Sequence, residues 1–143
     1  MDALKGNAIE IPNEYVVIAE LIEHDSTRQF MRLLNLADPP TLIFCSNIYH
    51  TMGALDAMLE YNLDIPRDVS IMSFDLLSSF PYYGFTKAFR PQFASIVQPR
   101  EEIGVKTAEL LLHRLDKGME DYEPIQIELT TTFTMTESVA DLS

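Results

Sequence analysis

The stretch from residue 41 to residue 75 places the tightest limits on how this chain can fold. It holds two short apolar runs, TLIFC and VSIMSF, which are rich in branched or aromatic residues and have the length of buried strands. Apolar residues recur at helical spacing between them, and Pro66 marks the turn that follows the helix. Two strands joined by one helix are most simply parallel, because a parallel pair needs such a crossover.

A polar residue follows each of these strands: Asn47 after the first and Asp75 after the second. Parallel strands end at the same edge of a sheet, and open α/β folds bind their ligands at that edge. A carboxylate accepts hydrogen bonds and an amide both donates and accepts, so the pair is suited to vicinal hydroxyl groups. The alternative is that both side chains only terminate their strands by bonding to nearby backbone.

The chain before this unit continues the same alternation of helix and strand. The run YVVIA at residues 15–19 predicts a strand. Ser26 and Gln29 have the spacing of a capping box, which predicts a helix from there to about Leu36. The first 75 residues therefore predict an α/β fold with a doubly wound, mostly parallel sheet.

Residues 76–91 lack any periodicity and carry several aromatic side chains, including Tyr82 and Tyr83. A loop of this length inside a compact domain is usually functional or interfacial. We expect either an aromatic wall beside Asp75 or a loop packed on its own core or on a second subunit.

The remaining segments are predicted to be a strand at 94–97, a helix at 100–117 and a strand at 124–135. Pro99 and two glutamates suit the first turn of the helix, and Gly118 suits its end. The apolar stripe of this helix is so broad that it needs a cover. The polar tail ESVADLS is expected to fray.

Composition narrows the classes of function. The net charge of −12 repels phosphates, so this piece alone is not expected to bind nucleic acid. The single cysteine, Cys45, excludes an internal disulfide and is expected to be a packed thiol. The three histidines have no metal-ligand spacing, no cofactor loop is present, and no apolar run is long enough to cross a bilayer. We therefore expect no metal, no cofactor, no membrane contact and no enzymatic activity.

The sequence PTLIFCSNIYHTMGALDAMLEYNLDIPRDVSIMSFD resembles a segment of the lac-repressor/gal-repressor family of transcriptional regulators. The resemblance continues through PQFASIVQP and EEIGVKTAELLLHRLDKG and more loosely into IELTTTFTMTES. It implies the effector-binding module of such a regulator, which has a periplasmic-binding-protein-like fold of type I. The opening residues would then lie within a helix that starts further upstream, in a longer protein with a DNA-binding headpiece.

The resemblance also divides the chain into parts. Residues 1–97 would form mainly the carboxyl-terminal lobe, residues 98–124 a crossover helix belonging to the other lobe, and residues 125–143 a return strand and tail. The apolar stripe of the crossover helix would then lack its partner lobe. We expect oligomerisation, a swapped element or refolding against the chain itself to bury it.

The resemblance assigns roles to individual residues. Asp75 matches the effector-contacting aspartate of the family, Asn47 the asparagine of its N-D pair, and Gln98 a position at the hinge between lobes. Ile48 and Leu76 replace carboxylates of the family, and Thr136 replaces an arginine. A sugar or related metabolite would therefore bind weakly to this chain alone. The expected interface of a homodimer or higher oligomer is one helix face and the aromatic loop, with Met52, Leu55, Met58, Tyr82 and Tyr83.

Together these observations predict the ligand-sensing and dimerisation module of a sugar-responsive, cytoplasmic transcriptional regulator, which reaches DNA only through a headpiece absent from this chain. The main alternative is a fragment of a transport-type periplasmic sugar-binding protein of the same fold, which would need an export signal and a stable monomer. A third class, an enzyme on a flavodoxin-like sheet, would need a nucleophile or cofactor loop.

Overall fold

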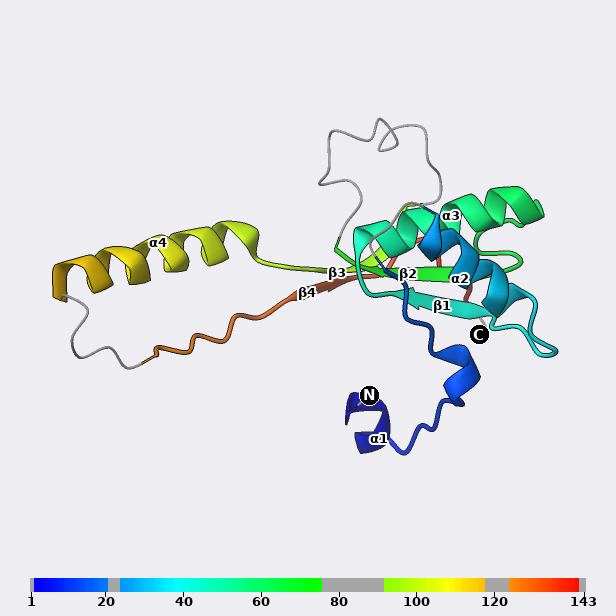
Figure 1. Cartoon of the computed structure of the whole chain (residues 1–143), viewed down its shortest axis with the longest axis horizontal. Helices are drawn as coiled ribbons and strands as arrows, with labels where there is room; N and C mark the ends of the chain where they lie inside the picture. Colours follow the sequence, from blue (N-terminus) through cyan, green and yellow to red (C-terminus); the bar gives the residue numbers. More distant parts are fainter. Residues whose placement is uncertain (1, 21–23, 76–91, 118–123, 142–143) are drawn as a thin grey trace.

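The computed structural model describes residues 2–20, 24–75, 92–117 and 124–141 of the chain. Helices and strands alternate through most of these residues (Figure 1). In chain order, the elements are α1 (Asp2–Gly6), the 3-10 helix η1 (Asn13–Tyr15), α2 (Asp25–Leu34), β1 (Leu42–Cys45), α3 (Ile48–Tyr61), β2 (Ser70–Phe74), β3 (Ala94–Val97), α4 (Arg100–Lys117) and β4 (Thr132–Thr134).

The strands form one sheet in the order β1-β2-β3-β4. β1, β2 and β3 run parallel, and β4 pairs with β3 in the antiparallel direction. Cys45 lies opposite Ser73, so β1 and β2 end at the same edge of the sheet. The predicted parallel β1-α3-β2 unit is confirmed, as is the fold class, an α/β fold with a mostly parallel sheet.

The core lies between the sheet and the pair of helices α2 and α3, which pack against each other on one face (Figure 1). Burial alternates along β1, where Ile43 and Cys45 point into this core. Leu42 and Phe44 point the other way and are each 51% exposed. Side chains of successive strand residues point to opposite faces, so the helices cover one face of β1 and leave the other open.

The contact between α2 and α3 depends on a residue without a side chain. A Cβ atom added at Gly53 of α3 would lie 2.4 Å from Cβ of Ser26 in the first turn of α2. That distance is shorter than any real carbon–carbon contact, so only glycine allows this approach. Ser26 is accordingly buried, and the predicted capping box is wrong. His24 occupies the cap position with φ of 66°, and no side chain caps the helix.

The predicted strand YVVIA is also wrong. Residues 16–20 form no strand, and the residues just before them form η1. A strand needs a neighbour for its backbone groups. β1 pairs only with β2 in the described part of the chain, and Ile18 is 88% exposed. The β-branched composition was therefore not sufficient to form a strand here.

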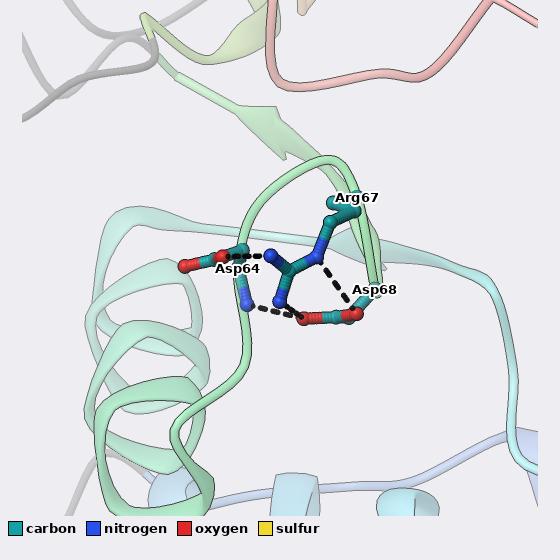
Figure 2. A network of polar contacts seen from close by, with 3 residues as sticks. All are labelled: Asp64, Arg67 and Asp68. Atoms are coloured by element: carbon teal, nitrogen blue, oxygen red, sulfur yellow. Dashed lines mark hydrogen bonds and ion pairs between the residues drawn. The ribbon is translucent and has the colours of Figure 1, made fainter.

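A compact polar turn connects α3 to β2 (Figure 2). The helix ends at Tyr61, where Asn62 adopts the left-handed conformation. In the turn, Arg67 pairs with Asp64 at 2.8 Å and with Asp68 at 3.0 Å, and the backbone N–H of Asp64 donates to the Asp68 carboxylate at 2.7 Å. These contacts close the turn on itself at the edge opposite the one after Cys45.

The tail is ordered through residue 141, so the expectation that it frays is wrong for those residues. Ser138 is fully buried; its hydroxyl donates to the Ile71 carbonyl at 2.7 Å and accepts from the Ala94 N–H at 2.8 Å. The Ile71 N–H donates to the Ser138 carbonyl at 2.9 Å. Ser138 thus joins β2 and β3 at the end of the sheet where their own pairing has not yet begun.

α4 extends away from the sheet together with the segment that leads back to β4 (Figure 1). Of the predicted strand at 124–135, only Thr132–Thr134 pairs with the sheet. Large apolar side chains along α4 lie in solvent: Val105, Leu111, Leu112 and Leu115, with Leu115 70% exposed. The predicted broad apolar stripe is therefore present and uncovered in this chain.

Candidate functional site at the carboxyl edge of the sheet

Asp75 lies directly after β2, where the chain leaves the sheet. Its backbone adopts φ of 74°, and its N–H donates to the Ile96 carbonyl of β3 at 2.8 Å. The Ser73 hydroxyl donates to the Asp75 carbonyl at 2.9 Å. Aspartate tolerates the left-handed conformation better than most residues. These contacts fix the direction in which the carboxylate leaves the sheet.

Two side chains from the β3–α4 connection reach the Asp75 carboxylate. The Gln98 amide donates to Oδ1 at 2.9 Å, and an Arg100 Nη2 nitrogen lies 3.6 Å from the same oxygen. The structure therefore brings together two of the predicted site residues, Asp75 and Gln98. Arg100 was not singled out from the sequence. Its position two residues after Gln98, in the first turn of a helix whose start was predicted, is the signal that would have identified it.

Asn47 lies at the same edge but uses its amide locally. Its side-chain oxygen accepts from the His50 backbone N–H at 3.0 Å, which caps α3. Its Nδ2 lies 3.2 Å from Nδ1 of His50. The capping role that the sequence left open is thus present, and a ligand at Asn47 would share or displace these contacts.

A hollow of about 480 Å³ opens beside the Asp75 cluster. It is lined by the β3–α4 connection: Val97, Gln98, Pro99, Arg100, Glu101 and Glu102. Arg100 contributes a positive charge to this lining, and Glu101 and Glu102 contribute two negative charges. Asn47 is not among the residues that line this hollow.

Buried hydroxyl and thiol groups lie next to the residues at this edge of the sheet. Thr51 of α3 lies 2.8 Å from the Ser73 hydroxyl and donates to the Asn47 carbonyl at 3.0 Å. Burial raises the pKa of the Cys45 thiol to about 12, against a smaller lowering by a hydrogen bond with Thr51. A thiol with that pKa stays protonated at neutral pH and is not a nucleophile, in line with the packed thiol that was expected.

The predicted interface residues divide into three groups. Leu55 and Met58 are buried in the core of the chain itself, and their assignment to a subunit surface is corrected for that reason. Met52 is partly exposed. Tyr82 and Tyr83 lie outside the described residues. The outer face of α3 instead presents Tyr49, Asp56, Leu59 and Glu60 beside Met52.

The described residues contain no group of three or more metal-ligating side chains. No helix among them is both long enough and apolar enough to span a bilayer.

Comparison with known proteins identifies the family of this chain. The periplasmic binding protein-like domain matches residues 2–138. The chain belongs to this family. The HTH-type transcriptional repressor PurR of Escherichia coli is 30% identical over 141 residues, which are 99% of this chain and 39% of PurR. The chain thus spans about two fifths of the curated relative, and the predicted likeness to lac-repressor-type regulators is confirmed.

Solved structures show the same fold. A LacI family transcriptional regulator from Enterococcus faecium, with bound ribose, has a TM-score of 0.75 and 24% identity; the match covers 99% of this chain and 49% of that one. The transcription regulator CcpA of Lactococcus lactis has a TM-score of 0.74 and 24% identity, with 97% and 48% covered. Both matches confirm the mostly parallel α/β architecture.

Proposed function

We propose that this chain is the ligand-sensing and dimerisation part of a sugar-responsive transcriptional regulator. The observation that carries the proposal is the Asp75 carboxylate, presented after β2 beside Gln98 and Arg100. It lies at the edge where parallel α/β sheets bind ligands. The family membership and the PurR and LacI-type relatives support a binding role rather than a catalytic one.

The chemistry of the Asp75 cluster suits a polyhydroxylated molecule. The carboxylate accepts from hydroxyl groups, the Gln98 amide donates and accepts, and Arg100 donates only. A sugar hydroxyl both donates and accepts, so it is able to replace the contacts that these three residues make with one another. Ribose, the ligand of the Enterococcus faecium structure, is a suitable probe of this class.

Binding is expected to be weak in this chain by itself. Ile48, which stands where the family has a carboxylate, is buried in the core. The site therefore lacks one hydrogen-bonding group, and each unpaired hydroxyl of a sugar lowers affinity. Leu76, the second such position, lies outside the described residues.

We propose further that residues 98–124 belong to a second lobe, with residues 125–143 returning from it. The exposed stripe of α4 and its distance from the sheet support this division. Ligand binding would close the two lobes and change the spacing of DNA-binding headpieces in the whole regulator. The regulator would act as a dimer in the cytoplasm and contact DNA only through those headpieces.

Replacing the central carboxylate tests this function. Asp75→Asn keeps the size of the side chain but loses the charged acceptor. Calorimetric titration with ribose should give a dissociation constant raised about tenfold or more relative to the unchanged chain, because charge-assisted hydrogen bonds are the stronger ones.

The matched control is Asp64→Asn, since Asp64 is an exposed aspartate in the turn of Figure 2 and makes no contact with Asp75. It should bind ribose like the unchanged chain. Equal affinity in Asp75→Asn and the unchanged chain would contradict the proposed site.

A further inference from the structure

His50 carries a polar atom that the structure leaves without a partner. The residue lies in the first turn of α3, three positions after Asn47, and its ring is partly buried. Nε2 is buried and has no hydrogen-bond partner among the described residues. Buried polar atoms are nearly always hydrogen-bonded, so an exception needs a physical explanation.

The contacts of the other ring nitrogen determine where the proton lies. Asn47 accepts the His50 backbone N–H with its side-chain oxygen at 3.0 Å, so the amide nitrogen Nδ2 must be the atom 3.2 Å from His50 Nδ1. An amide nitrogen only donates, and the Ser46 hydroxyl lies 2.9 Å from the same Nδ1. Nδ1 therefore accepts, and the neutral ring carries its proton on Nε2. The atom without a partner is a donor.

His50 lies at the carboxyl edge of the sheet, where Asp75 also lies. Ser46 and Asn47 follow β1 directly, as Asp75 follows β2, and the two strands are in parallel register. His50 and Gly53 are three residues apart and share one flank of α3, and Gly53 touches the first turn of α2. His50 thus lies in the first turn of α3, beside the carboxyl edge of the sheet.

We propose that His50 is a specificity-determining residue of the effector site and that its Nε2–H donates to an acceptor oxygen of the ligand. This inference rests on the proposed function. It assigns to the ligand a carbonyl, ring or hydroxyl oxygen that accepts a hydrogen bond on the Asn47 side of the edge.

The donor also accounts for a departure of this chain from its family. The resemblance predicts a carboxylate at residue 48, which accepts from a ligand hydroxyl, but Ile48 is in the core. The hydrogen-bond donor of His50 takes the place of the carboxylate acceptor, so the site selects an acceptor atom of the ligand instead of a donor. A ligand with an oxygen that only accepts gains from this exchange, and a hydroxyl adapts by turning its proton away.

Two substitutions separate this role from simple support of Asn47. His50→Asn keeps a polar atom near the Nδ1 position and removes the Nε2 donor, whereas His50→Gln places an amide near the Nε2 position. With ribose as the probe, calorimetry should show affinity lowered about tenfold in His50→Asn and restored to within about threefold in His50→Gln. Tyr49→Phe, an exposed neighbour, should bind as the unchanged chain does.

If His50→Gln is the weaker binder, the inference is overturned. That result would mean that the ring acts by positioning Asn47 through Nδ1. Equal loss in both variants would overturn it as well. If Asp75→Asn lowers ribose affinity and both His50 variants bind normally, the inference fails while the proposed function stands.

A measurement on the unchanged chain covers the case in which a variant does not fold. Long-range ¹H–¹⁵N spectra of the histidine ring should show the His50 proton on Nε2, and ribose should shift the Nε2 signal more than the Nδ1 signal. A proton on Nδ1, or an Nε2 signal that ribose does not move while heat of binding is observed, would overturn the inference. If ribose gives neither heat nor a shift, both the inference and the proposed function fail.

Discussion

Two small residues at the ends of the sheet, Ser73 and Ser138, make hydrogen bonds on which the fold depends. Ser73 holds the Asp75 carbonyl at one end of β2, and Ser138 bonds to both β2 and β3 at the other. Each is a small hydroxyl that is fully buried. Buried polar groups stabilise a fold when every one is paired and destabilise it when one partner is removed. The two serines are therefore sensitive positions.

We expect Ser138→Ala to lower the free energy of unfolding by about 1–3 kcal/mol, because it leaves the Ala94 N–H buried without its acceptor and removes a donor to the Ile71 carbonyl. Urea unfolding followed by circular dichroism measures the change. Thr131→Ala, which removes an exposed hydroxyl from the same terminal segment, should shift stability far less. Equal stability of Ser138→Ala and the unchanged chain would show that the tail is not held as described.

At the scale of elements, the turn between α3 and β2 links stability to pH. Arg67 donates a hydrogen bond to Asp68, and this bond, followed by the one from the Asp64 backbone N–H, lowers the Asp68 pKa from its ordinary value. A lowered carboxyl pKa in the folded chain adds stability above the unfolded pKa. That stability is lost as the pH falls through the folded pKa.

We expect Arg67→Gln to raise the Asp68 pKa toward its ordinary value, as measured by carboxyl carbon NMR during acid titration. The difference in unfolding free energy between the two proteins should shrink as the pH falls below the ordinary aspartate range. The pair lies at the surface, so the effect should weaken further in high salt. Arg32→Gln, on the exposed side of α2, should leave the Asp68 titration unchanged.

α4 has apolar side chains that suit a buried helix, but they lie in solvent. A helix with Leu111, Leu112 and Leu115 in water exposes apolar surface that, if covered, would stabilise the fold by roughly several kcal/mol. We expect the unchanged chain to bind an apolar fluorescent dye or to associate, and Leu112→Gln/Leu115→Gln to reduce both. Dye fluorescence and analytical ultracentrifugation measure the two effects.

Asp116→Asn, an exposed change on the same helix, serves as the control and should alter neither signal. A monomer that binds no dye before any substitution would show that α4 is covered by the chain itself.

On the scale of the whole molecule, the outer face of α3 is the candidate surface for association between subunits. Met52 lies on this face with Tyr49 and Leu59, while Leu55 and Met58 face inward. Met52→Glu should therefore weaken any dimer at least tenfold, because it adds a charge to the apolar part of this face. Met52 also packs against the core, so the stability of the subunit is measured in parallel. Sedimentation at several concentrations measures the dimer constant.

Arg32→Glu, on the exposed side of α2, provides the comparison for Met52→Glu and should leave association as it is. A dimer constant unchanged by Met52→Glu would move the interface away from α3.

The parts of this fold that sequence predicts are those set by residues close together in the chain. Hydrophobic spacing identified β1, α3, β2 and α4. The β-branched run YVVIA forms no strand, because a strand also needs a neighbouring strand for its backbone groups. The buried state of Leu55 and Met58 depends on α2 lying over α3, which their helical spacing alone does not reveal.

The sequence by itself determined that Asn47 and Asp75 share one edge, because a strand-helix-strand unit leaves parallel strands little choice of direction. Only the tertiary structure decided which atoms meet there. Gln98 reaches Asp75 across 23 residues, and Ser138 reaches Ile71 across 67. Contacts between such distant residues depend on how the elements pack, and no local pattern of apolar and polar residues encodes them.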